Sequence, residues 1–468
     1  MTAPMERKPQ AETIAAISTP PGRGGVGVIR VSGPGVPAVI AGVLKERLEP
    51  RVATRATFRD SDGEAIDQGL ALHFPAPRSY TGEHVLELHG HGGPAVLRLL
   101  LIRCTELGAR LARPGEFTQR AFLNGKLDLA QAESVADLID AATTTAARAA
   151  ARSLSGVFSA EIRALVDALI ELRMFVEATL DFPEEDVEFL RAADVRGRIE
   201  AIAARISDVL ARAKQGALLR EGLAVVLVGR PNVGKSSLLN RLAGEDLAIV
   251  TPIAGTTRDA VQSPIEIQGI PLTIIDTAGL RPTDDPIETL GIDRTWAAVA
   301  RADLALVLID ASAGADNADA DAAILAQLPA TLPRLVVHNK IDLVMIAATV
   351  ESRPAEPRAD EAGTQRHVFL SAKTGAGVDL LKCEILALAD VHEDMEDTFL
   401  ARERHLDALR AAAAHLDSAL THFTAGKPPL ELIAEDLRVA HTALSAITGE
   451  FTSDDLLGVI FSRFCIGK

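Results

Sequence analysis

The sequence predicts a multidomain α+β and α/β protein, and three observations carry this prediction. The chain has 468 residues, too many for one ordinary core when a domain takes roughly 100 to 200 residues. Helical periodicity occupies two separated segments. Between them, short apolar runs alternate with helical stretches, which indicates βα units and a mainly parallel sheet. The expected domains are an N-terminal α+β domain (1–127), a helical domain from two segments (128–217 and 385–468) and an inserted α/β domain (218–384).

The N-terminal segment mixes short β-rich runs with glycine and proline punctuation, which favours an α+β domain. Residues 26–31 and 85–88 are expected strands, and 20–25 is a Gly/Pro-rich turn. After Leu129 apolar residues recur at helical spacing, and such stripes need partner helices, which the segment after Ile385 can supply. The stripes are Val135, Leu138, Ile139 and Ala142, then Ile162, Leu165, Leu169, Leu172 and Val176.

Composition excludes several classes of function. The net charge of −16 argues against a protein that coats nucleic acid, because such binding needs clustered Lys and Arg. The three cysteines lie far apart and form neither a disulfide framework nor a C-x-x-C metal motif, which favours a reducing compartment. No signal-peptide core and no run of 18 apolar residues is present. The sequence therefore predicts a cytoplasmic protein without membrane function.

The inserted segment alternates strands and helices, and a glycine-rich loop follows its first strand. The expected strands are 223–228, 272–275, 304–309, 335–337 and 368–370.

That loop, 229–236, has the pattern G-x4-G-K-S. Its glycines let backbone N–H groups wrap phosphates, Lys235 reaches the β- and γ-phosphates, and the Ser236 hydroxyl ligates Mg²⁺. The helix start also favours an anion. A turn that only joins strand to helix is the alternative. The nucleotide contacts expected here are Asn232, Val233, Gly234, Lys235, Ser236 and Ser237.

Three further segments follow later strands of the inserted domain. Asp276 ends one strand, where a carboxylate can hold the Mg²⁺ shell and the Gly279 N–H can meet the γ-phosphate. Asp342 can accept hydrogen bonds from N1–H and the exocyclic amine of guanine, a donor pair that adenine lacks. The sequence thus predicts a Ras-like P-loop GTPase domain, with Asp276 and Lys235 as catalytic residues. The contacts expected with GTP in these segments are Asp276, Thr277, Ala278, Gly279, Asn339, Lys340, Asp342, Ser371, Ala372 and Lys373.

The loop 255–259 lies where a switch segment carries a threonine for Mg²⁺, and Thr257 is the expected ligand. A Gly-Thr turn with a surface Arg-Asp pair is the alternative. Leu280 stands where Ras-like enzymes place the glutamine that orients water, and leucine cannot do this. Since the sequence identifies no arginine finger, another charge must neutralise the transition state. The amide of Asn232 can ligate a monovalent cation, or it can be a turn residue only.

Further motifs lie outside the nucleotide segments: 20–30 (PPGRGGVGVIR), 79–83 (SYTGE) with 89–93 (HGHGG), 113–126 (RPGEFTQRAFLNGK) and 464–468 (FCIGK). With them the chain resembles the MnmE (TrmE) family of tRNA-modification GTPases over nearly its full length. The terminal motif is the most specific.

The resemblance implies an N-terminal folate-binding and dimerisation domain, a two-segment helical domain and an inserted GTPase domain. Family members form homodimers and work with an FAD-dependent partner, MnmG (GidA), in a heterotetramer or larger complex. They install a carboxymethylaminomethyl or aminomethyl group at C5 of the wobble uridine of tRNA, with carbon from 5-formyl- or methylene-tetrahydrofolate. GTP hydrolysis drives conformational change.

Carried over by position, the family's folate contacts fall at Arg30, Glu87, Lys126 and the terminal Lys468. Cationic groups suit the glutamate tail of folate, and a carboxylate suits the donor edge of the pterin. A structural Arg30–Glu87 ion pair and a solvated Lys126 are the alternatives. Cys465 matches the family's C-terminal cysteine, either a reactive thiol or a packing residue.

The resemblance also implies a potassium site that replaces the missing arginine finger. The family's catalytic glutamate falls at Glu288, where it can orient water through a second water. The sequence alone favours a solvated residue at a helix end for Glu288. The K⁺ ligands implied are Asn232, Thr251, Ile253 and Thr256, and both of these threonines are also expected nucleotide contacts.

The main rival interpretation is a ribosome-assembly GTPase of the Era or Der kind, which shares the nucleotide motifs. Such a protein would not explain the N-terminal motifs, the split helical segment or the FCIGK terminus. A dynamin-like structural GTPase is a third class, but no basic amphipathic helix for lipid stands out.

Overall fold

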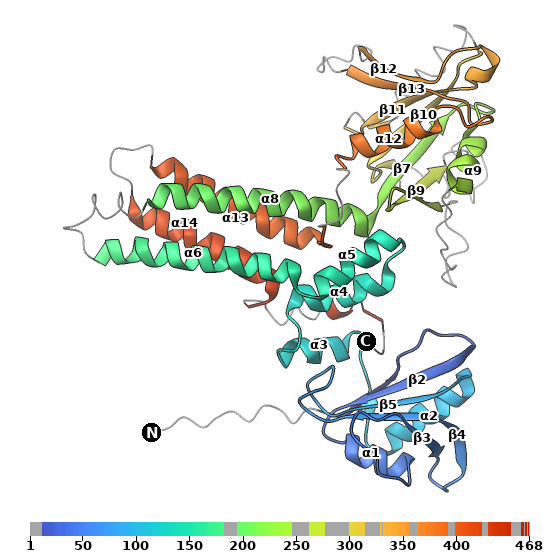
Figure 1. Ribbon diagram of the computed structural model, residues 1–468, viewed down its shortest axis with the longest axis vertical. Helices are drawn as coiled ribbons and strands as arrows, with labels where there is room; N and C mark the ends of the chain where they lie inside the picture. The colour runs from blue at the N-terminus through green and yellow to red at the C-terminus, as the bar shows by residue number, and fades with distance from the viewer. Residues whose placement is uncertain are drawn as a thin grey trace, which may run out of the picture. The chain divides into compact units, whose positions relative to one another are not determined.

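The computed structural model (Figure 1) describes most of the chain. The chain folds as two compact units. The first comprises Met1–Ile139, Arg152–Ile206 and Ala408–Lys468, and the second comprises Asp140–Ala151 and Ser207–Asp407. No described helix is both long and apolar enough to cross a membrane. The described residues are 12–181, 194–245, 262–276, 299–313, 328–329, 331–354, 364–391, 398–423, 429–450, 460–462, 464–465 and 467.

The N-terminal domain is built on a six-stranded sheet in the order β3-β4-β5-β2-β1-β6. Its strands pair antiparallel, apart from β1 and β6, which are parallel. The expected strands 26–31 and 85–88 lie within β2 and β5. The bounds are β1 (Ile14–Ile17), β2 (Gly24–Ser32), α1 (Val36–Val43), β3 (Thr54–Arg59), β4 (Ala65–Phe74), β5 (Val85–Gly92), α2 (Pro94–Glu106), β6 (Arg110–Leu111) and α3 (Glu116–Leu123).

Alternation along the strands gives this sheet an apolar core on one face and a smaller apolar cluster with α3. Ala15 of β1 belongs to the main core with α1 and α2, whereas Ile14 and Ala16 pack with Phe117 of α3. Successive strand residues point to opposite faces, so one short strand serves both clusters. The fold therefore holds α3, and the RPGEF motif that begins it, close to β1.

The helical segments provide α4 (Leu129–Asp140), α5 (Thr144–Leu154), α6 (Val157–Asp181), α8 (Val195–Glu221), α13 (Glu403–His422) and α14 (Leu430–Thr448). All five expected apolar residues of the α6 stripe are buried. Helix α6 packs against α14, which presents Ile433, Leu437 and Leu444 as buried residues. The prediction that the second helical segment completes the first is confirmed.

The expected stripe Val135, Leu138, Ile139 and Ala142 is wrong at two residues. Ile139 is 44% exposed. Ala142 does not continue the stripe, because α4 ends at Asp140 and a new helix begins at Thr144. Thr143 explains the break, since its hydroxyl accepts a hydrogen bond from the N–H of Ala146 at 3.1 Å and so caps the start of α5. Periodicity alone cannot separate two short helices with such a junction.

The inserted domain has a seven-stranded sheet in the order β12-β13-β11-β10-β7-β9-β8. Neighbouring strands are parallel except at the two edges, where β8 and β12 pair antiparallel. The mainly parallel sheet was predicted, but these two edge strands were not. The bounds are β7 (Leu223–Gly229), α9 (Lys235–Glu245), β8 (Gln262–Ile267), β9 (Ile270–Asp276), β10 (Leu304–Asp310), β11 (Arg334–Asn339), a short 3₁₀ helix (Ile341–Leu343), β12 (Thr349–Pro354), β13 (Thr364–Phe369) and α12 (Val378–Leu388).

Candidate functional site

The phosphate-binding motif occupies the turn between β7 and α9. Strand β7 ends at Gly229 and α9 begins at Lys235. Gly234 has φ +99°, and a side chain there would collide with the amide of Asn339. The Lys235 ammonium donates to the carbonyls of Gly229 at 2.5 Å and Arg230 at 3.2 Å. The loop therefore combines a helix N-terminus with a lysine held over its own backbone, an arrangement suited to phosphate groups.

A cavity of about 280 Å³ lies beside this loop, between the segments that follow β11 and β13. It is lined by residues that the sequence assigned to the nucleotide: Gly234, Ser237, Asn339, Lys340, Asp342, Ser371, Ala372 and Lys373, together with Leu343. The structure thus brings the phosphate loop and both base-recognition segments into one pocket. The pocket lies at the edge of the sheet where the parallel strands end. Open α/β sheets bind their ligands at this edge.

Asn339 joins three parts of this pocket. Its side chain is buried, with its amide nitrogen donating to the Val233 carbonyl at 2.8 Å and its oxygen accepting from the Ala372 N–H at 2.9 Å. A buried amide that uses both ends fixes the phosphate loop against the last base-binding segment. Asn339 therefore shapes the pocket through its two neighbours.

Asp342 is held by the hydroxyl of Ser371, which donates to its carboxylate at 2.6 Å. This bond leaves the second carboxylate oxygen and further lone pairs for donors of a base. Two adjacent N–H donors, as guanine presents, match an ionised carboxylate. The geometry fits the role expected of Asp342.

Two residues that the sequence did not single out contact residues that line the pocket. Asp310, at the end of β10, pairs with the Lys340 ammonium at 2.5 Å. Burial alone would raise the pKa of Asp310, but hydrogen bonds from Lys340 and Ser312 lower it. Arg241 of α9 donates to the carbonyls of Ala372 at 3.4 Å and Lys373 at 2.8 Å. The only sequence signal for Asp310 was its position at a strand end.

Asp276 ends β9 and pairs in the parallel register with Leu227 of β7, which lies just before the phosphate loop. Ser236 is the second residue of α9. These two residues are the described positions at which Mg²⁺ could be held. Among the described residues no group of three or more His, Cys, Asp or Glu side chains forms a metal site.

The remaining residues predicted for this site lie outside the described residues. They are the catalytic residue Glu288, the Mg²⁺ ligand Thr257, the K⁺ ligands Thr251, Ile253 and Thr256, the nucleotide contacts Thr277, Ala278 and Gly279, and Leu280.

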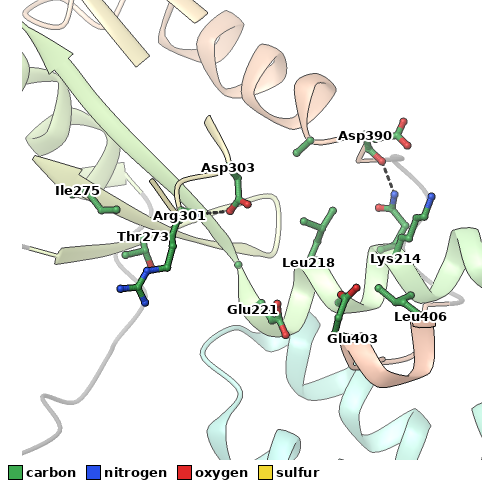
Figure 2. Close-up of a pocket in the computed structure, with 15 residues that line it drawn as sticks. Lys214, Leu218, Glu221, Thr273, Ile275, Arg301, Asp303, Asp390, Glu403 and Leu406 are labelled. Carbon is green, nitrogen blue, oxygen red and sulfur yellow. Dashed lines mark hydrogen bonds between the residues drawn. The ribbon is translucent and has the colours of Figure 1, made fainter. Parts of the chain in front are cut away.

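A larger cavity, of about 790 Å³, lies in the same unit but contains none of the nucleotide motifs (Figure 2). It is lined by the last turns of α8, the first residues of β7 and part of β9. Gln215 donates to the Asp390 carbonyl at 2.5 Å, and the Asp303 carboxylate accepts from the Ala224 N–H at 2.8 Å. Since parallel strands start on this side, it is the edge away from the nucleotide pocket.

In the N-terminal domain, Arg30 and Glu87 face each other on neighbouring strands β2 and β5. Their side chains form an ion pair at 2.9 Å, and the Arg30 guanidinium lies over the rings of Tyr80 at 5.4 Å and Phe117 at 5.8 Å from the centroids. His89 lies 3.2 Å from the second oxygen of Glu87. The pair is therefore a structural ion pair beside aromatic rings, and its side chains remain 23% and 18% exposed.

Of the other two expected folate residues, the structure describes only Lys126. The exposed Lys126 ammonium lies 3.4 Å from the Pro77 carbonyl, and Lys468 lies outside the described residues. Cys465 is exposed, and its carbonyl accepts from the Gly115 N–H at 3.4 Å. The Ser18 hydroxyl donates to the Gly467 carbonyl at 3.0 Å. Cys465 and Gly467 are thereby hydrogen-bonded to the N-terminal domain.

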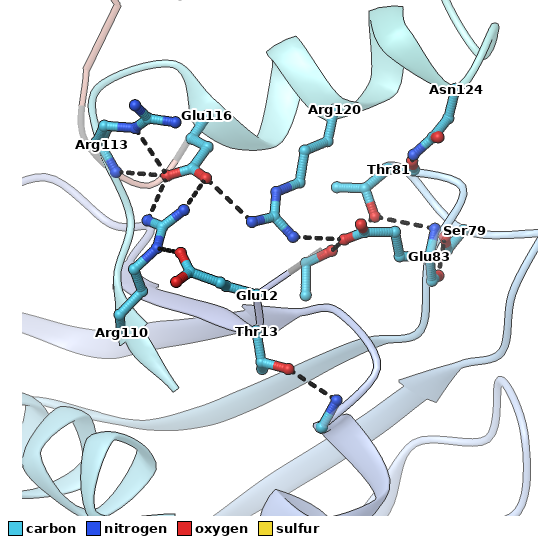
Figure 3. Close-up of polar contacts among 12 residues, drawn as sticks. Glu12, Thr13, Ser79, Thr81, Glu83, Arg110, Arg113, Glu116, Arg120 and Asn124 are labelled. Atoms are coloured by element: carbon cyan, nitrogen blue, oxygen red, sulfur yellow. Dashed lines mark hydrogen bonds and ion pairs between the residues drawn. The ribbon is translucent and has the colours of Figure 1, made fainter. Parts of the chain in front are cut away.

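A buried charge network, which the sequence did not predict, holds the RPGEF motif and the SYTGE motif together (Figure 3). Glu116 accepts from Arg110 at 2.6 and 2.8 Å and from Arg120 at 3.0 Å, and Arg120 also donates to Glu83 at 2.9 Å. Burial would raise the pKa of Glu116, but these bonds and the Arg113 N–H lower it to about 2. The network fixes the loop that carries Tyr80 beside Arg30.

Comparison with known proteins places these observations in one family. A family model described as the TrmE N-terminus of GTP-binding proteins matches residues 13–126, and the MnmE helical domain model matches residues 129–465. A tRNA modification GTPase MnmE of Ralstonia nicotianae is 59% identical over 467 residues, covering 97% of this chain and 96% of the relative.

Other relatives agree over the same length. The MnmE tRNA modification GTPase of Dechloromonas aromatica is 58% identical and covers 98% of this chain and 100% of the relative. That of Laribacter hongkongensis is 60% identical, over 98% and 99% respectively. Full-length similarity at this level removes the Era or Der alternative, which shares only the nucleotide-binding domain. The chain, with its N-terminal domain, its two-part helical domain and its inserted Ras-like GTPase domain, belongs to the MnmE (TrmE) family of tRNA modification GTPases.

Proposed function

We propose that this GTPase installs a carboxymethylaminomethyl or aminomethyl group at C5 of the wobble uridine of tRNA. It acts as a cytoplasmic homodimer with an FAD-dependent MnmG-type partner, and a tetrahydrofolate derivative supplies the carbon. Hydrolysis of GTP drives the conformational change. The observation that carries the proposal is the presence of two different sites on one chain, a guanine-type pocket around Asp342 and the Arg30–Glu87 pair beside aromatic rings.

In the nucleotide pocket, Asp342 would accept the two N–H donors of guanine while Lys235 and the α9 N-terminus bind the phosphates. Mg²⁺ held by Ser236, Thr257 and Asp276 would neutralise charge on the phosphates. Glu288 would orient the attacking water, because Leu280 has no group to do so. These roles are proposed from the motifs and from the geometry of the described residues.

Potassium is the proposed substitute for an arginine finger, with Asn232 as its side-chain ligand and Thr251, Ile253 and Thr256 as further ligands. Asn232 lies in the phosphate loop with φ +64°, which places it in the left-handed region that Asn tolerates. We expect GTP hydrolysis to be at least about tenfold faster in KCl than in NaCl at equal ionic strength, since one arginine-finger charge is worth roughly 10³ or more. Equal rates would reject the cation site.

At the N-terminal site, Glu87 would accept from the donor edge of a pterin ring, with the ring of Tyr80 providing aromatic surface near it. Arg30, Lys126 and Lys468 would pair with carboxylates of the glutamate tail. Support comes from the Arg30–Glu87 pair, whose mostly buried side chains keep part of their surface exposed. Cys465 is proposed to lie beside this site, either as a thiol that reacts or as a packing residue.

The deciding experiment combines the purified chain, an MnmG-type flavoprotein, a tetrahydrofolate derivative, GTP and unmodified tRNA. Mass spectrometry of the digested nucleosides should find C5-modified wobble uridine. A parallel reaction with GDP in place of GTP, and one with the Glu288→Ala variant, should give little product. Unmodified uridine in the complete reaction would sink the proposal, provided that the chain hydrolyses GTP under the same conditions.

A further inference from the structure

The turn between β8 and β9 is tied to the first residues of α5. The Thr143 hydroxyl donates to the Gly269 carbonyl at 2.8 Å, and Thr143 is only 5% exposed. Gly269 has φ +88°, and a Cβ on it would collide with the Thr145 side chain. A hydrogen bond and a close approach that only glycine allows therefore fix one turn against one helix start.

The same hydroxyl has two tasks. It accepts from the Ala146 N–H at 3.1 Å, while the Thr143 carbonyl accepts from the Ala147 N–H at 3.0 Å. A threonine hydroxyl has one donor and two acceptor positions, so donation to Gly269 and capping of α5 occur together. If the turn moves, the cap of α5 must move with it or break this bond.

The turn belongs to a stiff hairpin. Gln268 at φ +49° and Gly269 at φ +88° both have positive φ, as in the tight two-residue turns that suit twisted strands, and Ile267 pairs directly with Ile270. On its other flank, a Cβ on Gly222 would collide with the Pro271 carbonyl, so the junction of α8 and β7 also contacts the start of β9. The hairpin is held at its turn from two sides.

The other ends of the two strands connect to the switch positions. Strand β8 follows the segment that carries Thr257, and β9 ends at Asp276, directly before the Thr277–Gly279 motif. A displacement at either switch therefore acts on one of these strands, and the hairpin passes it to its turn. This property follows from connectivity, because both strands are continuous.

The start of α5 belongs to the same compact unit as the hairpin. Residues 140–151 and the turn at Gly269 both lie in the unit of the GTPase sheet. The contact between Thr143 and Gly269 is therefore a contact within that unit.

We infer that Thr143 is a positioning residue that couples the nucleotide state of the GTPase hairpin to α5 through its bond to Gly269. The inference rests on the proposed function in one respect, that GTP turnover drives a conformational change. It names the contact through which this change reaches α5. Because coupling between two sites is reciprocal, the state of α5 also biases the hairpin.

The test is hydrogen exchange of the full-length chain with GDP and with a non-hydrolysable GTP analogue. In the wild type, the amides of Ala146 and Ala147 should exchange at different rates in the two states. Thr143→Val keeps the shape but removes the hydroxyl, and should reduce this difference by at least about fivefold, the lower end of ordinary coupling. Thr143→Ser should restore it. GTP hydrolysis by the valine variant should remain within about threefold of the wild type, since the chemistry is not touched.

Two controls separate coupling from damage. Thr13→Val makes the same substitution at the start of α1, where the Thr13 hydroxyl accepts from the Gly35 N–H at 2.7 Å, and leaves the hairpin intact. Gly269→Ala should also uncouple α5, whereas Gly63→Ala introduces the same positive-φ strain, at φ +85°, in a turn with nothing closer than 3.9 Å. Thr13→Val and Gly63→Ala should keep the nucleotide-dependent exchange.

The outcomes are distinct. The inference is overturned if the wild type shows the same exchange rates at Ala146 and Ala147 with both nucleotides. It is also overturned if these rates still depend on the nucleotide in both Thr143→Val and Gly269→Ala. Failure of the wild type to modify tRNA would instead count against the proposed function, because the exchange measurement needs neither tRNA nor a partner. Loss of modification by Thr143→Val with retained hydrolysis would support both.

Discussion

At the scale of single residues, the nucleotide pocket depends on side chains that hold other side chains. Ser371 orients Asp342, Asp310 fixes Lys340, and Asn339 links the phosphate loop to Ala372. Each bond fixes a group that would contact the base or loop, so the pocket is formed before a ligand enters. Preorganisation of this kind lowers the entropic cost of binding.

The first residue-scale prediction concerns the choice of base. Asp342→Asn replaces an acceptor pair by one acceptor and one donor, which suits xanthine with its carbonyl at C2 better than guanine with its amine. We expect GDP affinity to fall by about a hundredfold or more and xanthosine diphosphate to become the better ligand. Calorimetry with both nucleotides measures this. Asp379→Asn, an exposed carboxylate of α12, is the control, and unchanged GDP affinity in Asp342→Asn would contradict the assignment.

The second concerns Arg241, whose guanidinium donates to two successive carbonyls of the loop after β13. Arg241→Ala should weaken GDP binding by about tenfold, the worth of one to two hydrogen bonds, with little change in kcat. The GDP affinity of Arg241→Lys should lie between those of the wild type and Arg241→Ala. The control is Arg438→Ala, which removes an exposed helical ion pair. If the alanine variant lowers kcat and leaves GDP affinity intact, Arg241 acts elsewhere.

At the scale of elements, the buried charge network fixes α3 to its neighbours. Glu116 is 3% exposed and joins β6, the 76–84 loop and α3 through Arg110, Arg120 and Glu83. Loss of one partner in such a network leaves buried charges without compensation. The orientation of the motif loops thus depends on a carboxylate that contacts no ligand.

This network gives a pH prediction. The pKa of Glu116 is about 2 in the fold against an ordinary 4.5, so its stabilisation is complete above pH 4.5 and is lost as pH falls toward 2. The shift corresponds to about 3 kcal/mol. Glu116→Gln should lower the free energy of unfolding of the N-terminal domain by a similar amount at pH 7 and flatten its dependence between pH 4.5 and 2.

The free energy of unfolding of the N-terminal domain is measured by urea denaturation followed by tyrosine fluorescence, because Tyr80 is the chain's single tyrosine. Glu106→Gln, a half-exposed carboxylate in an i,i+3 pair with Arg103, should change little and serves as control. A Glu116→Gln curve that matches the wild type at both pH values would show that the network does not stabilise the domain.

At the scale of the whole molecule, the Arg30–Glu87 pair and the Asp342 pocket belong to different compact units. Effects of changes at sites without shared partners usually add. Arg30→Ala should therefore weaken binding of 5-formyl-tetrahydrofolate by about tenfold, the loss of a charge-assisted hydrogen bond. It should leave GDP affinity unchanged. Asp342→Asn should weaken GDP binding and leave the affinity for 5-formyl-tetrahydrofolate unchanged.

Calorimetry of the single and double variants with each ligand tests this independence. Arg55→Ala, an exposed arginine of the same sheet, controls for loss of charge. Full folate affinity in Arg30→Ala would remove Arg30 from the folate site. A change in GDP affinity in that variant would mean that the two sites are coupled in the absence of turnover.

The sequence by itself determined the family, the strand and helix types, the mainly parallel sheet and the order of the nucleotide motifs. It could do so because those motifs are local: Gly234, Lys235 and Ser236 act through the backbone of one turn, and apolar spacing reports burial within one element. Only the tertiary structure decided the edge strands β8 and β12, the break before Thr143, and the partners of Asp310, Arg241 and Glu116. These depend on atoms brought together from distant parts of the chain, as when Thr143 meets Gly269, 126 positions away. No periodicity or motif records such a contact, because it exists only once the elements have packed.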